Sequence, residues 1–114
     1  MIAEDTDSVQ YALRLVMEYL GHEVVDVAND GDEVLAKCEN SHPEVVLMDV
    51  KMPHMDGLTC TALLAKERPE TKVVIVTGGR TTADQARAAG ASAFVEKPFD
   101  VNQLSELMFS LRVA

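Results

Sequence analysis

Three acidic side chains follow short apolar segments of this chain, where the strands of a parallel sheet would end. Glu4 and Asp5 follow residues 1–3, and Asp49 follows residues 45–48, which read Val-Val-Leu-Met. Carboxylates that lie close together repel one another unless they retain protons or share a cation. Mg²⁺ fits such a site, since it prefers oxygen ligands and combines one or two carboxylates with phosphate oxygens. A carboxylate can also attack phosphorus and form an aspartyl phosphate.

Two further polar residues follow later apolar segments. Thr77 comes after residues 73–76, and Lys97 comes shortly after residues 93–95. Lys97 could neutralise charge on a transferring phosphoryl group, and the Thr77 hydroxyl could donate to one of its oxygens. Taken alone, Thr77 could instead cap the following helix, and Lys97 could be an ordinary solvated surface charge. Because the carboxyl ends of parallel strands meet at one edge, we expect all five residues to converge, with Asp49 as phosphoacceptor.

The elements that must position these residues alternate between short β-branched runs and longer helical patterns, five times along the chain. This alternation predicts an α/β fold with a doubly wound parallel sheet covered by helices on both faces. The expected strands are residues 1–3, 23–28, 45–48, 73–76 and 93–95. The first is so short that we expect the native start to be either trimmed or abrupt.

Capping residues define several predicted helix ends. Asp7 or Ser8 is expected to cap the first helix and Gly21 to end it in a left-handed conformation. Asp56 is expected to cap a helix that begins at Gly57. The helix over residues 82–89 is mostly Ala, so it should form readily but bury few large side chains and be the most loosely held.

The length of 114 residues predicts one domain that spans residues 1–114. Nineteen acidic and ten basic residues give a formal charge of −9, which argues against direct nucleic-acid binding. No apolar run is long enough for a membrane span and no signal peptide is recognisable, so we expect a cytoplasmic protein. Cys38 and Cys60 lack disulfide or zinc spacing and are expected to be small buried hydrophobes. The histidines are expected to be exposed and non-functional; they are His22, His42 and His54.

Four separated motifs resemble the receiver domain of bacterial two-component response regulators, most closely the chemotaxis-type, single-domain form. They are residues 43–57, which contain Met-Asp-Val-Lys-Met-Pro-His-Met-Asp-Gly, together with Glu4-Asp5, Val76-Thr77-Gly78 and Glu96-Lys97-Pro98-Phe99. The resemblance covers essentially the whole chain. It implies a flavodoxin-like five-stranded sheet with strand order 2-1-3-4-5, and a cis peptide bond before Pro98.

The resemblance implies that Asp49 takes a phosphoryl group from a histidine kinase or a histidine phosphotransfer protein in a two-component phosphorelay. It also implies that Asp5 and Asp49 bind Mg²⁺, that Glu4 usually acts through water, and that the backbone carbonyl of Lys51 completes the protein ligands. Glu4 replaces the commoner Asp, which lengthens that arm by one methylene. The domain would be a signalling switch that assists its own phosphorylation and dephosphorylation, rather than an enzyme with an independent substrate.

The resemblance also implies a conformational switch that responds to phosphorylation. Thr77 and Phe94 match the family's paired switch positions, and Phe94 lacks the hydroxyl of the Tyr often found there, so we expect it to favour an inward rotamer. The expected readout surface is the fourth helix, fifth strand and fifth helix, where an output domain or downstream protein would dock. A homodimer is also possible. Lys51 and Gly79 occupy loop positions that modulate phosphoryl lifetime, and we expect a lifetime that is not exceptionally long.

Two other functions can be weighed against this interpretation. Thr77-Gly78-Gly79 before a helix resembles the phosphate loop of a nucleotide-binding oxidoreductase, but such glycines belong at the first strand-to-helix turn. That turn instead carries Glu4-Asp5, whose charges would repel a pyrophosphate. A receiver that acts only as an interaction module stays open as an alternative. Against it, all five site positions carry chemically competent residues.

Overall fold

Five parallel strands form one sheet in the order β2-β1-β3-β4-β5. The computed structural model describes residues 1–112. The strands are β1 (Ile2–Ala3), β2 (Val27–Ala28), β3 (Val45–Met48), β4 (Lys72–Thr77) and β5 (Ala93–Glu96). The expected doubly wound sheet and its flavodoxin-like strand order are therefore confirmed.

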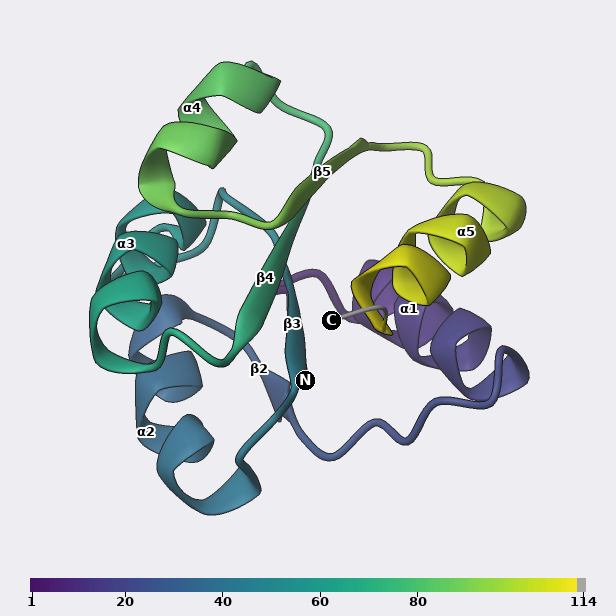
Figure 1. Ribbon diagram of the computed structural model, residues 1–114, viewed down its shortest axis with the longest axis horizontal. Coiled ribbons are helices and arrows are strands. Elements are labelled where there is room, and N and C mark those ends of the chain that lie inside the picture. The colour runs from purple at the N-terminus through teal and green to yellow at the C-terminus, as the bar shows by residue number, and fades with distance from the viewer. Residues whose placement is uncertain (113–114) are drawn as a thin grey trace.

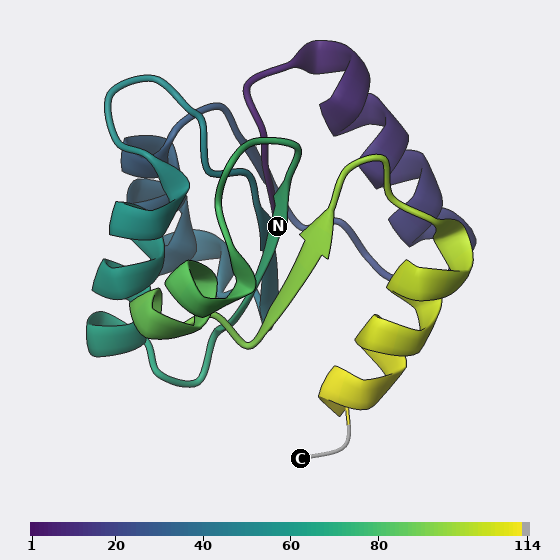
Figure 2. The ribbon, with the colours of Figure 1, turned by 90° about the horizontal axis from the view of Figure 1, so that it is seen from above.

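The helices cover both faces of the sheet, as the alternating sequence pattern predicts (Figures 1 and 2). They are α1 (Asp7–Tyr19), α2 (Gly31–Ser41), α3 (Gly57–Glu67), α4 (Ala83–Ala89) and α5 (Val101–Arg112). Helices α1 and α5 lie side by side on one face, and α2, α3 and α4 cover the other. No helix within residues 1–112 is long and apolar enough to cross a membrane.

The sheet separates two apolar clusters. Alternate residues of a strand point to opposite faces, and neighbours on β3 accordingly divide between the clusters. Leu47 packs on the α1 and α5 side, whereas Met48 packs on the side of α2, α3 and α4. Cys38 and Cys60 are fully buried in the second cluster, which confirms their prediction as buried hydrophobes.

The prediction of a strand over residues 23–28 was wrong at its beginning, because β2 contains only Val27 and Ala28. Its pairing with β1 begins where Ile2 lies opposite Val27. Residues 23–25 have no neighbouring β1 residue at their level, and strand structure requires such a pairing partner. β2 is short because β1 is short.

Most predicted helix ends agree with the structure, with one correction at α1. Its N-cap is Thr6, not Asp7 or Ser8, and the Thr6 side chain makes no capping hydrogen bond. Gly21 adopts a left-handed conformation with φ of 91°, as predicted. Asp56 caps α3 through its Oδ1 atom, which accepts from the Thr59 N–H at 2.8 Å.

Helix α4 buries little, as its composition predicts. Ala86 is its buried residue. Its start is nevertheless well defined by a capping box, in which Thr82 and Gln85 bond reciprocally to each other's backbone N–H groups. Local capping rather than core packing therefore holds this helix.

Candidate functional site

The carboxyl ends of β1 and β3 bring the three predicted acidic residues together. Oxygen atoms of Glu4, Asp5 and Asp49 all lie within 4.8 Å of one another. Glu4 is fully buried and Asp49 is 8% exposed, while Asp5 is exposed at the mouth. This arrangement concentrates negative charge where bulk water screens it poorly, so a cation is required nearby.

Lys97 supplies positive charge from the loop that follows β5. Its Nζ lies 2.6 Å from Glu4 Oε1 and 3.6 Å from Asp49 Oδ2. The peptide bond between Lys97 and Pro98 is cis, as the resemblance implied. The Lys97 N–H also donates to the Thr77 carbonyl at 2.9 Å, which fixes this loop against the end of β4.

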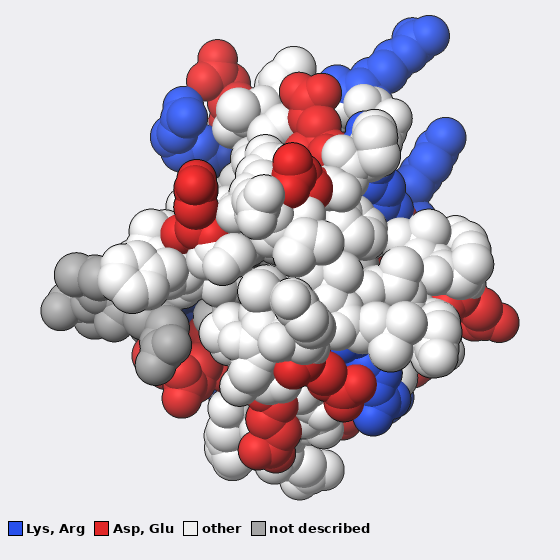
Figure 3. All heavy atoms as spheres, turned by 90° about the vertical axis from the view of Figure 1, so that its right-hand side faces the viewer, with Lys and Arg blue, Asp and Glu red and all other residues white. Residues whose placement is uncertain are grey.

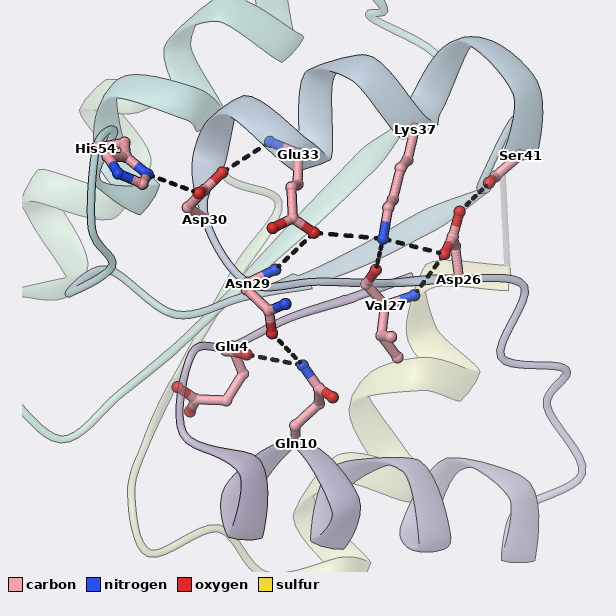
Figure 4. A network of polar contacts seen from close by, with 10 residues as sticks. All are labelled: Glu4, Gln10, Asp26, Val27, Asn29, Asp30, Glu33, Lys37, Ser41 and His54. Carbon is pink, nitrogen blue, oxygen red and sulfur yellow. Dashed lines mark hydrogen bonds and ion pairs between the residues drawn. The ribbon is translucent and has the colours of Figure 1, made fainter.

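Glu4 is held in place by the backbone of Thr6 and by Gln10 of α1. Its second oxygen, Oε2, accepts from the Thr6 N–H at 3.3 Å, so both carboxylate oxygens have partners. Its carbonyl accepts from Gln10 Nε2 at 2.8 Å, and the same nitrogen lies 3.2 Å from Asn29 Oδ1. Figure 4 shows Gln10 reaching from α1 to both groups. The sequence gives no sign of this role for Gln10.

Asp49 is fixed by backbone contacts on both sides. Its N–H donates to the Ala3 carbonyl at 2.9 Å, and its Oδ1 accepts from the Val50 N–H at 2.8 Å. Gly57, the first residue of α3, approaches so closely that a Cβ atom there would lie 1.9 Å from the Asp49 carbonyl oxygen. Only glycine permits this approach. The requirement explains the glycine at the end of the longest motif.

Thr77 is the last residue of β4 and is 3% exposed. Its Oγ1 accepts from the Gly79 N–H at 3.2 Å, which leaves the hydroxyl hydrogen available for another acceptor. Phe94 is half-buried and lines, with Ala86 and Arg87 of α4, a cavity of about 70 Å³. Its predicted inward bias stays a prediction, as does the switch.

His54 is exposed, as expected, and it also makes a structural contact that the sequence does not predict. Its Nδ1 lies 2.8 Å from Oδ2 of Asp30, the N-cap of α2. The neighbouring Gly31 N–H donates to the Met55 carbonyl at 3.2 Å. His54 therefore helps to fix the loop after Asp49 onto the start of α2. Sequence reasoning missed it because the two partners come from different loops.

The His54 contact affects both of its ionisable groups. The hydrogen bond to Asp30 raises the pKa of His54 above its ordinary value, and the charge of Asp30 acts in the same direction. The pKa of Asp30 is lowered by the Glu33 backbone N–H and by the His54 hydrogen bond. Of the other histidines, His42 is exposed as expected, while His22 is half-buried.

Asp30 and His54 also form, with Asp32, a second group whose ligand atoms lie within 4.8 Å of one another. Asp30 already accepts from the Glu33 N–H at 2.8 Å. The group stands at the N-terminus of α2, where the helix dipole favours negative charge and opposes a cation. The acidic group around Asp49 is the better cation site, because it consists of three carboxylates, two of them buried, whereas the second group has two carboxylates and an imidazole.

Comparisons with known proteins agree with this geometry. A family model described as the response regulator receiver domain matches residues 1–109. The chain is 36% identical over 105 residues to the transcriptional regulatory protein PdtaR of Mycobacterium tuberculosis, covering 91% of this chain and 51% of that protein. It is 28% identical over 110 residues to the chemotaxis protein CheY of Thermotoga maritima, covering 95% and 92%.

A solved structure of similar fold is the CheX-CheY-BeF3-Mg complex from Borrelia burgdorferi. It superimposes with a TM-score of 0.91 at 26% identity, covering 99% of this chain and 87% of that chain. The chain spans about half the length of PdtaR but nearly all of the Thermotoga CheY. Since the family match extends over nearly the whole chain and the sheet order agrees with it, this chain belongs to the response regulator receiver domain family.

Proposed function

We propose that Asp49 accepts a phosphoryl group from a phosphohistidine on a histidine kinase or histidine phosphotransfer protein. The observation that carries this proposal is the largely buried Asp49 carboxylate, with Lys97 Nζ at 3.6 Å and the oxygens of Glu4 and Asp5 within 4.8 Å. One Asp49 oxygen is oriented by the Val50 N–H, and Oδ2, which faces Lys97, is the proposed nucleophile.

In the proposed step, Asp49 Oδ2 forms a bond to phosphorus while the P–N bond of the phosphohistidine breaks. The donor nitrogen leaves with the electron pair and takes up a proton from solvent. Lys97 then exchanges its contact with Glu4 for the phosphoryl oxygens, and the Thr77 hydroxyl donates to one of them. Most of the catalysis is positioning and charge neutralisation, as is general for phosphoryl transfer.

The donor set fits Mg²⁺, which receiver domains generally bind at this acidic pocket. Three carboxylates supply only oxygen ligands, and the single ammonium of Lys97 does not balance their charge. We propose that Asp5, Asp49 and the Lys51 carbonyl bind the ion, with Glu4 acting through water. Bound there, Mg²⁺ would supply charge stabilisation to the phosphoryl oxygens.

The surface formed by α4, β5 and α5 would change on phosphorylation and be recognised by the partner. Phosphorylation would draw in Thr77, whose movement leaves room for Phe94 to turn inward. An output domain or a downstream protein would dock there. This surface suits such a role because α4 is held by capping rather than by a large buried face. We propose a signalling switch, not an enzyme with a separate substrate, acting in the cytoplasm.

Intact-protein mass spectrometry after incubation with acetyl phosphate and Mg²⁺ tests the proposed chemistry. The wild-type chain should gain the mass of one phosphoryl group, and Asp49→Asn should gain none. Asp56→Asn is a matched control, because Asn retains helix-capping ability and Asp56 lies outside the acidic group, so its phosphorylation should equal that of wild type. An unmodified wild-type chain would favour the alternative of a phosphorylation-silent interaction module.

A further inference from the structure

The segment that joins β1 to α1 carries two of the acidic residues but lacks the side-chain cap that often secures the start of a helix. Thr6 is the N-cap of α1, and its side chain makes no capping hydrogen bond. Asp5 is exposed, so packing constrains its side chain little. The direction of the Asp5 carboxylate therefore depends on the backbone that carries it.

Gln10 of α1 contacts this segment at two places. Its backbone N–H donates to the Thr6 carbonyl at 2.9 Å, and its side-chain Nε2 donates to the Glu4 carbonyl at 2.8 Å. Asp5 is the residue between these two carbonyls. A single residue of α1 thus fixes the backbone on both sides of Asp5.

The Gln10 amide is itself held in one orientation. Nε2 carries two hydrogens, and its second acceptor is Asn29 Oδ1 at 3.2 Å. The Asn29 N–H in turn lies 3.4 Å from Oε1 of Glu33, in the first turn of α2. Because the Glu4 group is a carbonyl oxygen, a rotated amide would place Oε1 against another acceptor. Figure 4 shows the Gln10 amide between Glu4 and Asn29.

We propose that Gln10 is a positioning residue for cation binding at the acidic site. By holding the carbonyls on either side of Asp5, it keeps the Asp5 carboxylate within 4.8 Å of the Glu4 and Asp49 oxygens. Gln10 acts through the backbone of a ligand and does not contact the ion. Groups that orient a metal ligand commonly change the affinity for the metal. The inference rests on the proposed function, in which Mg²⁺ binds to Asp5 and Asp49.

A purely structural role for Gln10 makes a different prediction. Lys37 forms the same kind of contact, since its Nζ donates to the Val27 carbonyl at 2.7 Å and ties a helix to a strand. Val27 is not part of the acidic group. Loss of either donor should destabilise the fold, but only loss of the Gln10 donor should disturb the acidic site. Lys37→Met is therefore the matched control for Gln10→Met.

The dissociation constant for Mg²⁺ tests the proposal. Titration of the backbone amide resonances by NMR measures it for the wild type, Gln10→Met and Lys37→Met. Met is close to Gln in length but has no hydrogen-bond donor. Physiological ionic strength limits the long-range effect of the charge that Lys37→Met removes. Urea unfolding without Mg²⁺ measures the stability of each variant.

Gln10→Met should raise the dissociation constant about fivefold, less than the roughly tenfold or larger effect of groups that bond directly to a ligand side chain. Lys37→Met should change it by less than about twofold, with a comparable decrease in the urea midpoint. Equal dissociation constants in the wild type and Gln10→Met would overturn the proposal. So would an equal rise in both variants, because lost stability alone would then explain it. A wild type without Mg²⁺-dependent shifts would overturn the proposed metal site itself, and this inference with it.

A double-variant experiment tests the contact with Asn29. Asn29→Ala removes Oδ1 but keeps the backbone N–H, and it should raise the dissociation constant for Mg²⁺ about twofold because the Gln10 amide is then less well held. Combined with Gln10→Met, it should add nothing to the effect of Gln10→Met alone. Effects that multiply in the double variant would overturn the proposed route through the Gln10 amide.

Discussion

The contact between Lys97 and Glu4 dominates the electrostatics of the site. Glu4 is fully buried, and its Oε1 lies 2.6 Å from the ammonium. Removal of one partner from a buried ion pair leaves an uncompensated charge, which costs more than the pair itself contributes. The ammonium therefore has a structural role as well as its proposed role in phosphoryl transfer.

Substitution of Lys97→Met is expected to lower the free energy of unfolding by about 3 kcal/mol in the absence of divalent ions. The cause is the buried Glu4 carboxylate, which loses its main charged partner. Urea unfolding measures the change. The double variant Lys97→Met with Glu4→Gln should recover a large part of the lost stability, because the buried side chain at position 4 then carries no charge. Equal destabilisation of the single and double variants would contradict this reasoning.

The contact between His54 and Asp30 predicts a dependence on pH. Asp30 raises the pKa of His54, so this stabilisation is complete below the unfolded value of about 6.5 and is lost as the pH rises through the higher folded value. The pKa of Asp30 is lowered, so its contribution is present above about 4 and is lost as the pH falls through the lower folded value. The contact should stabilise most between these limits.

NMR titration of the imidazole resonances measures this effect directly. The His54 pKa should lie above that of an unfolded histidine, and Asp30→Asn should lower it. Asn retains the ability to cap α2, so this variant removes the charge with little change to the helix. An unchanged His54 pKa would show that the contact is not formed in solution.

Residue types and spacing predicted the acidic group well, because each member directly follows an apolar strand segment. Glu4, Asp5 and Asp49 could be placed together from the rule that parallel strands end at one edge. The contacts of Gln10 and His54 could not be predicted from any such rule. Gln10 of α1 contacts Asn29 and His54 contacts Asp30, and only the folded chain brings these separate segments together.

At the scale of elements, α2 is tied to the edge strand β2 by a polar network (Figure 4). Lys37 of α2 donates to the Val27 carbonyl at 2.7 Å and lies 3.3 Å from Glu33 and 3.7 Å from Asp26. Ser41, also of α2, donates to Asp26 at 2.8 Å. This network holds a strand that is only two residues long and is paired on one side.

Substitution of Lys37→Met is expected to lower the free energy of unfolding by about 1 kcal/mol, because Val27 loses a charged donor. Lys66→Met on the exposed surface of α3 is the matched control, and it should change the stability by much less. Chemical denaturation compares the two variants. An equal loss in both would show that the Lys37 contact contributes nothing specific.

The kinds and order of the elements followed from the sequence, but the length of β2 did not. The alternation of β-branched runs with helical patterns predicts each strand and helix from local residues alone. The extent of β2 depends instead on how much of β1 lies beside it. Local pattern cannot report such a dependence between segments far apart in the chain.

At the scale of the whole molecule, negative charge exceeds positive charge. Nineteen acidic residues stand against ten basic ones, and part of the excess is held close together around Asp49. Binding of a divalent cation to the folded state alone would raise stability through mass action. The unfolded chain offers no comparable gathering of carboxylates.

Mg²⁺ at about ten times its dissociation constant is expected to raise the thermal midpoint by about 5 °C. Asp5→Asn should greatly reduce the rise, because it removes one proposed ligand at the exposed mouth of the site. Differential scanning fluorimetry measures the midpoint, with NaCl at equal ionic strength as the control for screening. A rise of equal size in NaCl would exclude specific binding as its cause.

The outer surface also carries apolar side chains that packing does not explain. Tyr11, Leu15 and Tyr19 follow one another at intervals of one helical turn along α1 and are 64%, 48% and 83% exposed. Phe109 on α5 is 70% exposed. Figure 3 shows that the side of the molecule formed by α1 and α5 has a broad area without charged side chains, bordered by both acidic and basic ones.

The division of the interior by the sheet has a consequence for how such a protein can change over evolutionary time. Because Leu47 and Met48 belong to different clusters, replacements behind α1 and α5 should combine almost additively with replacements behind α2, α3 and α4. One half of the molecule can therefore diversify without matching changes in the other. A lineage could remodel its α1 and α5 surface while the packing beneath α2 and α3 is inherited unchanged.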